Sequence, residues 1–300
     1  MPRTLCRAAL VLAFCLLGIA HPIHASIDTV KKLRETKSIT LGYREAALPF
    51  SYTDEQGKPI GYAVDLCVRT VARMKARLAL SDLTIKWQPV TSANRIPLVT
   101  KGSVDLECGS TSNTAERQKR VAFGPTYFVS RLAIAVSAKS PITEFVQAAG
   151  QAVASATGTT SVIAIKRFEE SRGVDFKDFF LRDHQQAFDA LAAGRAVAVV
   201  LDDVLLAGFI AASSSPEAYR LLGEFLGAEG YGAMLRNDDP GFKALVTETF
   251  SELIASGEAE RLYEKWFTQP IPPKGINFQL PLSPELKALF QRPSSDPLKP

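Results

Sequence analysis

A unit of helix, glycine, apolar strand and polar terminus occurs twice in this chain and constrains its fold more than any other feature. In the first copy, Ser92–Thr100 predicts a short helix and Val104–Cys108 an apolar strand. In the second copy, Asp183–Ala193 predicts a helix and Ala196–Leu201 a strand. The copies lie about 90 residues apart, a spacing longer than the repeat of a solenoid. Because helices alternate with strands, we expect two α/β lobes of similar plan, each with a largely parallel sheet covered on both faces.

Two extended segments, Thr126–Val136 and Glu229–Leu235, predict strands that cross between the lobes. The first lobe would then contain residues 26–127 plus 232–300, and the second residues 128–231, with the crossing strands at its ends. A length of 300 residues suits two such domains. The expected fold is therefore α/β, with two mostly parallel sheets joined by two hinge strands around a cleft.

Residues 1–25 have the pattern of a cleaved secretory signal peptide. Two arginines precede the apolar run Ala8–Ala20, which is too short for a transmembrane helix. Phe14 stands where a small residue should precede a lipid-modified cysteine, so Cys15 does not indicate a lipoprotein. We expect cleavage near Ala25 and an exported chain without a lipid anchor.

The charge and the hydropathy of the remaining chain argue against nucleic acid and membrane as partners. Cleavage would remove two of the 35 basic residues and none of the 31 acidic residues, leaving a net charge of about +2. A charge this small does not indicate binding to nucleic acid or to an anionic membrane. The apolar run Ala196–Ala212 is interrupted by Asp202 and Asp203, which would be costly in lipid. It predicts a buried strand followed by a core helix.

The cysteines and histidines left after cleavage restrict the chemistry. Cys67 and Cys108 are an even pair in an exported chain, which most simply predicts one disulfide. His184 is then the only histidine, which excludes zinc sites built on two or more histidines. The segment Gly158–Thr159–Thr160 lacks the glycine-lysine ending of a phosphate loop. We expect neither a metal nor a cofactor.

Polar side chains follow the carboxyl ends of the predicted strands, where parallel α/β sheets bind their ligands. The candidate residues are Arg44, Ser92, Arg95, Ser110, Ser112 and Arg117 in the first lobe and Thr160, His184 and Asp202 in the second. A single arginine is usually a solvated surface residue, but three arginines at the strand ends of one lobe favour a binding site.

Purely structural roles stay open for the candidates of the second lobe. Thr160 lies in a segment that is expected to be at least a helix cap, and the free amides and the dipole of that helix also suit an anion. His184 suits the start of a helix or a core position. Spacing does not decide whether Asp202 or Asp203 faces the cleft.

The charges of the candidates describe a ligand. Three guanidiniums and one carboxylate leave the site at about +2 when the histidine is neutral. A small molecule with two carboxylates and one ammonium complements this set. Arginine suits carboxylates because its planar fork binds both oxygens at once.

Several segments resemble the glutamate/aspartate-binding proteins of ABC transporters, within family 3 of the solute-binding proteins. The resemblance covers residues 27–293 and is carried by Gly42–Glu45, Thr91–Pro97, Glu107–Thr111, Ala115–Gln118, Gly158–Ser161, Gly194–Val197 and Pro270–Lys274. It implies the two-lobed fold of a type II periplasmic binding protein. The Thr91–Pro97 and Ala115–Gln118 segments are typical of the branch that binds acidic amino acids.

The resemblance also implies a role for each candidate. Arg117, Ser112 and Thr160 would hold the α-carboxylate, Asp202 and Ser110 the α-ammonium, and Arg44, Ser92, Arg95 and His184 the side-chain carboxylate. Two positions depart from the pattern: Ser112 stands where threonine is usual, and Ala233 replaces a cysteine found in some members. The second departure leaves Cys67 as the partner implied for Cys108.

The expected function is capture of L-glutamate or L-aspartate and delivery to an inner-membrane ABC permease. The chain would be a monomer in a Gram-negative periplasm, since an unanchored exported protein is retained only by an outer membrane. One alternative is an enzyme similar to cyclohexadienyl dehydratase, with His184 or Glu229 as proton donor. Asp202 argues against this enzyme, because its carboxylate implies a ligand with an ammonium group, and prephenate has none. A sensory module would need a separate signalling partner. We therefore expect a binding protein with no catalytic residues.

Overall fold

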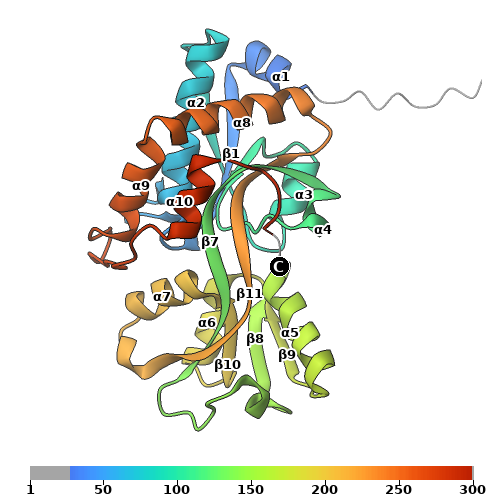
Figure 1. Cartoon of the computed structure of the whole chain (residues 1–300), viewed down its shortest axis with the longest axis vertical. Coiled ribbons are helices and arrows are strands. Elements are labelled where there is room, and N and C mark those ends of the chain that lie inside the picture. Colours follow the sequence, from blue (N-terminus) through green and yellow to red (C-terminus); the bar gives the residue numbers. More distant parts are fainter. Residues whose placement is uncertain (1–27, 299–300) are drawn as a thin grey trace, which may run out of the picture.

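A computed structural model describes residues 28–298, which form an α/β protein with two parts, one above the other in Figure 1. The expected signal peptide and its cleavage near Ala25 lie outside these residues. The strands are β1 Ser38–Tyr43, β2 Ala46–Ala47, β3 Ser51–Thr53, β4 Pro59–Ile60, β5 Thr84–Pro89, β6 Leu106–Cys108, β7 Val121–Ser137, β8 Ala152–Ala156, β9 Lys177–Leu181, β10 Ala198–Asp202 and β11 Tyr219–Arg236. The helices are α1 Thr29–Thr36, α2 Tyr62–Leu78, α3 Arg95–Thr100, α4 Ala115–Gln118, α5 Thr160–Arg172, α6 His184–Ala192, α7 Asp203–Ala212, α8 Pro240–Ala255, α9 Glu258–Phe267 and α10 Pro284–Gln291, with 3-10 turns at Phe145–Ala148 and Pro216–Ala218.

The main sheet has the strand order β5-β1-β6-β11-β7-β10-β8-β9. On one side of the β7–β11 pair, β1 is parallel to both β5 and β6. On the other side, β8 is parallel to both β9 and β10. The long strands β7 and β11 are antiparallel and run through both parts of the molecule (Figure 1). The predicted fold class is confirmed: two mostly parallel halves are joined by two long strands.

The hinge strands are longer than the sequence pattern indicated. β7 begins at Val121 and β11 begins at Tyr219, and the register pairs Val121 with Arg236 at one end and Ser137 with Tyr219 at the other. The extra length of β7 is buried against β11 and the upper helices, and the extra length of β11 pairs with β7 in the lower part. The lobe boundaries near residues 127 and 231 stay a prediction.

Both copies of the repeated unit are present in the structure. The second consists of α6 and β10, within two residues of the expected bounds. In the first copy, α3 begins at Arg95 instead of Ser92, because the Thr91 amide donates to Asn94 Oδ1 (2.7 Å) in a turn that precedes the helix. The run 196–212 contains β10 and the core helix α7, as expected. Between residues 28 and 298, no helix has both the length and the apolar character required to span a bilayer.

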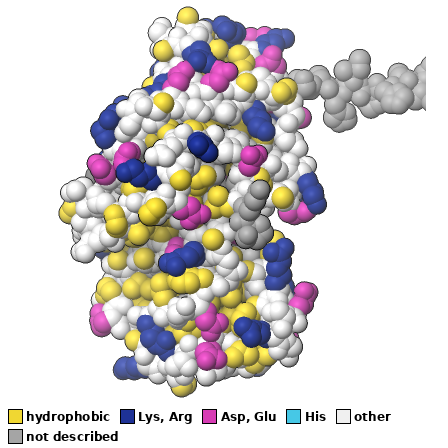
Figure 2. Space-filling view, viewed as in Figure 1, with side chains coloured by type: hydrophobic (Ala, Val, Ile, Leu, Met, Phe, Trp, Pro, Cys, Tyr) yellow, Lys and Arg dark blue, Asp and Glu magenta, His cyan; other side chains and the backbone are white. Residues whose placement is uncertain are grey.

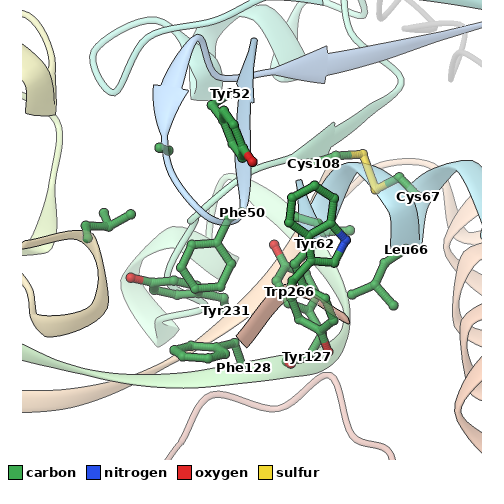
Figure 3. Close-up of a cluster of buried hydrophobic side chains, with 14 of the residues drawn as sticks. Phe50, Tyr52, Tyr62, Leu66, Cys67, Cys108, Tyr127, Phe128, Tyr231 and Trp266 are labelled. Atoms are coloured by element: carbon green, nitrogen blue, oxygen red, sulfur yellow. Dashed lines mark hydrogen bonds between the residues drawn. A yellow bond between two sulfur atoms is a disulfide. The ribbon is translucent and has the colours of Figure 1, made fainter. Parts of the chain in front are cut away.

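Aromatic side chains form the core of the upper part (Figure 3). The Phe50 ring lies 4.8 Å from that of Phe128 and 5.1 Å from that of Tyr231, which joins the loop after β2 to both hinge strands. The predicted disulfide is confirmed, since Cys67 of α2 is bonded to Cys108 at the end of β6. This bond fixes α2 to the strand that leads into the candidate residues Ser110 and Ser112.

Candidate functional site

Arg44 connects the upper part of the molecule to the lower part. It follows β1, is fully buried, and donates from Nη2 to Ser92 Oγ at 2.9 Å. The same hydroxyl lies 3.3 Å from Nε2 of His184, the first residue of α6. Arg44 also forms an ion pair with Asp183, which caps α6 by accepting from the His184 amide. Residues about 90 to 140 positions apart in the chain therefore meet at one place.

Arg95 lies next to the other two arginines, in a fully buried position. Its Nη1 donates to Thr111 Oγ1 at 2.8 Å, and the Thr111 hydroxyl donates to Oε2 of Glu107 at 2.6 Å. Burial and the charges of Arg117 and Arg44 lower the pKa of Arg95 to about 9. This repulsion shows that three guanidiniums share one region of low dielectric constant.

Arg117, at the third position of the short helix α4, also bridges the two parts. Its Nη1 donates to the Ser112 carbonyl at 2.9 Å and its Nη2 to the Gly158 carbonyl at 3.0 Å. The hydroxyls of Ser112 and Thr160 both donate to Oε2 of Glu229, each at 2.6 Å. Burial lowers the pKa of Arg117, and the carboxylate of Glu229 opposes that shift.

Gly158 allows this close approach. Its φ of +79° is in the left-handed region, and a Cβ at this position would lie 2.7 Å from the Ser92 carbonyl oxygen. A side chain there would separate the loop after β8 from the upper part. The glycine of the Gly158–Thr159–Thr160 segment thus permits contact between the two parts.

Asp202 faces the arginines, and Asp203 does not, which resolves the alternative that spacing left open. Asp203 accepts from the Ser130 hydroxyl at 2.8 Å and from Arg131 Nε at 3.2 Å, on β7. Asp202 is buried at the end of β10 and affects the pKa of both Arg95 and Arg117. Burial and the nearby carboxylate of Glu229 raise the pKa of Asp202 from 3.8 to about 7.

Replacing Asp202 with asparagine is expected to stabilise the ligand-free protein at pH 8 by about 2 kcal/mol. The raised pKa means that Asp202 holds its proton more tightly in the folded state than in the unfolded chain. Its contribution to stability therefore falls as the pH rises from about 4 through 7. Urea unfolding at pH 4, 6 and 8 would measure a gain for Asp202→Asn that grows with pH. A gain of the same size at every pH would contradict the assignment.

The charge count based on sequence is incomplete. Besides Asp202, three further carboxylates lie among the arginines: Glu107, Asp183 and Glu229. Four carboxylates therefore accompany three guanidiniums, and the site lacks the excess of about +2 that the candidates alone implied. Glu107 had one sequence signal, a charged residue inside an apolar strand. Asp183 was visible only as a helix cap, and no local pattern pointed to the contacts of Glu229.

Several buried polar atoms of the candidate residues have no hydrogen-bond partner within residues 28–298. They are Arg44 Nε and Nη1, Arg95 Nε, Ser110 Oγ, His184 Nδ1 and Asp202 Oδ1. Buried donors and acceptors without partners cost free energy, so their concentration in one place indicates groups that await a polar ligand. Burial, followed by the charges of the three arginines, lowers the pKa of His184 well below its ordinary value, so the imidazole is neutral.

Other features of the described residues do not offer a comparable site. A surface pocket of about 460 Å³ between α1 and α8 is lined by Asp28, Asp239 and Glu248, among others, and includes none of the candidates. No group of three or more histidine, cysteine or acidic side chains in residues 28–298 is placed to hold a metal ion. On the face seen in Figure 2, basic and acidic side chains are interspersed. The buried cluster is therefore the candidate functional site.

The whole chain is similar to known proteins. The glutamate/aspartate import solute-binding protein of Escherichia coli is 40% identical over 274 residues, with 91% of each chain covered. The L-glutamate/L-aspartate-binding protein of Pseudomonas aeruginosa is 42% identical, with 89% of this chain and 88% of that protein covered. Among solved structures, the ancestral amino acid-binding protein AncCDT-1, a precursor of cyclohexadienyl dehydratase, is 25% identical with a TM-score of 0.69, covering 80% of this chain and all of the other.

The family assignment rests on most of the chain. Residues 39–269 match the model of the bacterial extracellular solute-binding proteins, family 3. This range includes every candidate residue and both hinge strands. The chain is therefore a member of family 3 of the bacterial extracellular solute-binding proteins.

Proposed function

We propose that this protein binds L-glutamate or L-aspartate in the buried cluster and delivers it to an inner-membrane ABC permease. The observation that carries the proposal is the set of unpartnered buried donors and acceptors on Arg44, Arg95, Ser110, His184 and Asp202. A ligand with two carboxylates and an ammonium would satisfy them. The names of the relatives in Escherichia coli and Pseudomonas aeruginosa support the same ligands.

We assign the contacts as the resemblance implied them. Arg117, Ser112 and Thr160 would hold the α-carboxylate, Asp202 and Ser110 the α-ammonium, and Arg44, Ser92, Arg95 and His184 the side-chain carboxylate. Closure of the lobes 26–127 plus 232–300 and 128–231 about the hinge strands would exclude water and strengthen each ion pair. The protein would act as a periplasmic monomer, exported by residues 1–25.

A binding role is favoured over a dehydratase. The relatives from Escherichia coli and Pseudomonas aeruginosa, 40% and 42% identical to this chain, are both named as binding proteins. The likeness to a precursor of cyclohexadienyl dehydratase concerns a protein that itself binds amino acids. Asp202 also has no ammonium to pair with in prephenate. Incubation of the purified protein with prephenate and arogenate is expected to give no aromatic product, and formation of one would overturn this choice.

L-Glutamine is expected to bind more weakly than L-glutamate by at least about 3 kcal/mol, or roughly 150-fold. The two amino acids have the same shape, but a neutral amide offers no anionic acceptor to the unpartnered nitrogens of the buried guanidiniums, Nε and Nη1 of Arg44 and Nε of Arg95. Isothermal titration calorimetry with both ligands, and with L-aspartate and L-asparagine as a second pair, measures the difference. Comparable affinities within each pair would refute the assignment of these two arginines.

A further inference from the structure

Glu229 occupies the donors that the proposed function assigns to the ligand's α-carboxylate. The residue lies on the hinge strand β11, and its Oε2 accepts from the hydroxyls of Ser112, above, and Thr160, below, each at 2.6 Å. A hydroxyl has a single hydrogen to donate. While both hydrogens point to Glu229, neither is available to a ligand. A ligand carboxylate can use these two hydroxyls only after the Glu229 side chain has moved.

The third group of the same subsite is also influenced by Glu229. Among the carboxylates that oppose the effect of burial on the pKa of Arg117, Glu229 has the largest effect. The internal carboxylate therefore contacts both hydroxyls and acts electrostatically on the guanidinium. It holds the place that a ligand's α-carboxylate would take.

The charge balance makes displacement of Glu229 depend on the ligand. The cluster already contains four carboxylates for three guanidiniums, so an entering dianion gains little overall attraction. Glu229 and Asp202 lie close enough for Glu229 to raise the pKa of Asp202. An ammonium held at Asp202 would thus provide a counter-charge for the displaced Glu229 as well. A dicarboxylate that lacks an ammonium would leave the carboxylates of Asp202 and Glu229 without a counter-charge.

We propose that Glu229 selects for ligands with an ammonium next to the carboxylate, because it yields the α-carboxylate donors only to such ligands. The inference rests on the proposed function and deepens it. Glu229 would be a specificity-determining residue: the two hydroxyls are its partners in the free protein, and the ligand's ammonium is its partner in the complex.

Glutarate tests this proposal, since it is L-glutamate without the amino group. Calorimetry, or competition against bound L-glutamate, would compare both ligands on the wild type, Glu229→Ala and Glu229→Gln. Glu260→Gln, on the exposed side of α9, is the matched control for loss of one negative charge. Glu229→Ala is expected to bind glutarate at least about tenfold more tightly than the wild type does. L-Glutamate affinity should change by less, and Glu229→Gln should fall between, because its amide oxygen still accepts from both hydroxyls.

The outcomes separate the two proposals. A wild-type protein that binds no acidic amino acid would defeat the proposed function. If the wild type binds L-glutamate but glutarate binds Glu229→Ala no better than the wild type, only the role of Glu229 is overturned. Loss of both ligands from a variant that unfolds at the wild-type temperature would likewise overturn it, since Glu229 would then support the site. If Glu229→Ala does not fold, Glu229→Gln provides the test. It should bind glutarate more tightly than the wild type does, and an equal affinity would overturn the role of Glu229.

Discussion

Replacement of Arg117 by alanine is expected to weaken L-glutamate binding at least a thousandfold, or about 4 kcal/mol. Arg117 is buried, contacts both parts of the molecule through the Ser112 and Gly158 carbonyls, and has both hydroxyls of its subsite beside it. Its removal would leave the ligand's α-carboxylate desolvated without a cationic partner, which is costly in a site that excludes water. Isothermal titration calorimetry measures the loss directly.

Two matched variants make this result specific. Arg117→Lys keeps the positive charge but loses the planar fork, so we expect an affinity between those of the wild type and Arg117→Ala. Arg172→Ala removes an exposed arginine at the end of α5 and should leave binding unchanged. If Arg117→Ala retains the wild-type affinity while folding normally, Arg117 does not hold the α-carboxylate.

Removal of the Cys67–Cys108 disulfide is expected to lower the free energy of unfolding by about 4 kcal/mol. The bond closes a chain segment of 41 residues, and without it the unfolded chain gains conformational entropy. Both cysteines are buried in the aromatic core of Figure 3, where serine hydroxyls would add a desolvation cost. The Cys67→Ser/Cys108→Ser variant, compared with the wild type by urea unfolding, gives the difference.

Reduction of the wild type with dithiothreitol provides the control for that substitution. The reduced wild type keeps the cysteine side chains, so its loss of stability reports the bond alone. Because Cys108 ends β6 just before Ser110, we also expect weaker L-glutamate binding in both cases. Equal urea midpoints for oxidised and reduced protein would show that the bond does not stabilise the fold.

Local patterns predicted the elements whose hydrophobic periodicity is set within a few residues. The second repeat appears as α6 and β10, within two residues of the expected bounds. The bounds of the hinge strands were harder to predict from local patterns. β7 and β11 extend as far as their pairing with each other continues, and that pairing depends on residues about 100 positions away.

The site, like the fold, was only partly predictable from the sequence. The strand-end rule gathered nine candidates, and the structure places the arginines, Ser92, His184 and Asp202 in one buried cluster. It also separates Asp202 from Asp203, which spacing could not do. The acidic partners Glu107, Asp183 and Glu229 were not among these nine candidates, because each is defined by what it contacts after folding.

The sequence by itself determined the α/β plan, the family resemblance and the basic residues of the site, because periodicity and strand-end positions are local properties of a chain. Only the tertiary structure decided the electrostatic balance of the site. Asp183 pairs with Arg44, and Glu229 accepts from two hydroxyls, through contacts between elements far apart in the sequence. The strength of each of these electrostatic interactions depends on how deeply the groups are buried. Distance and desolvation fix these interactions, and both arise only when the two parts of the chain come together.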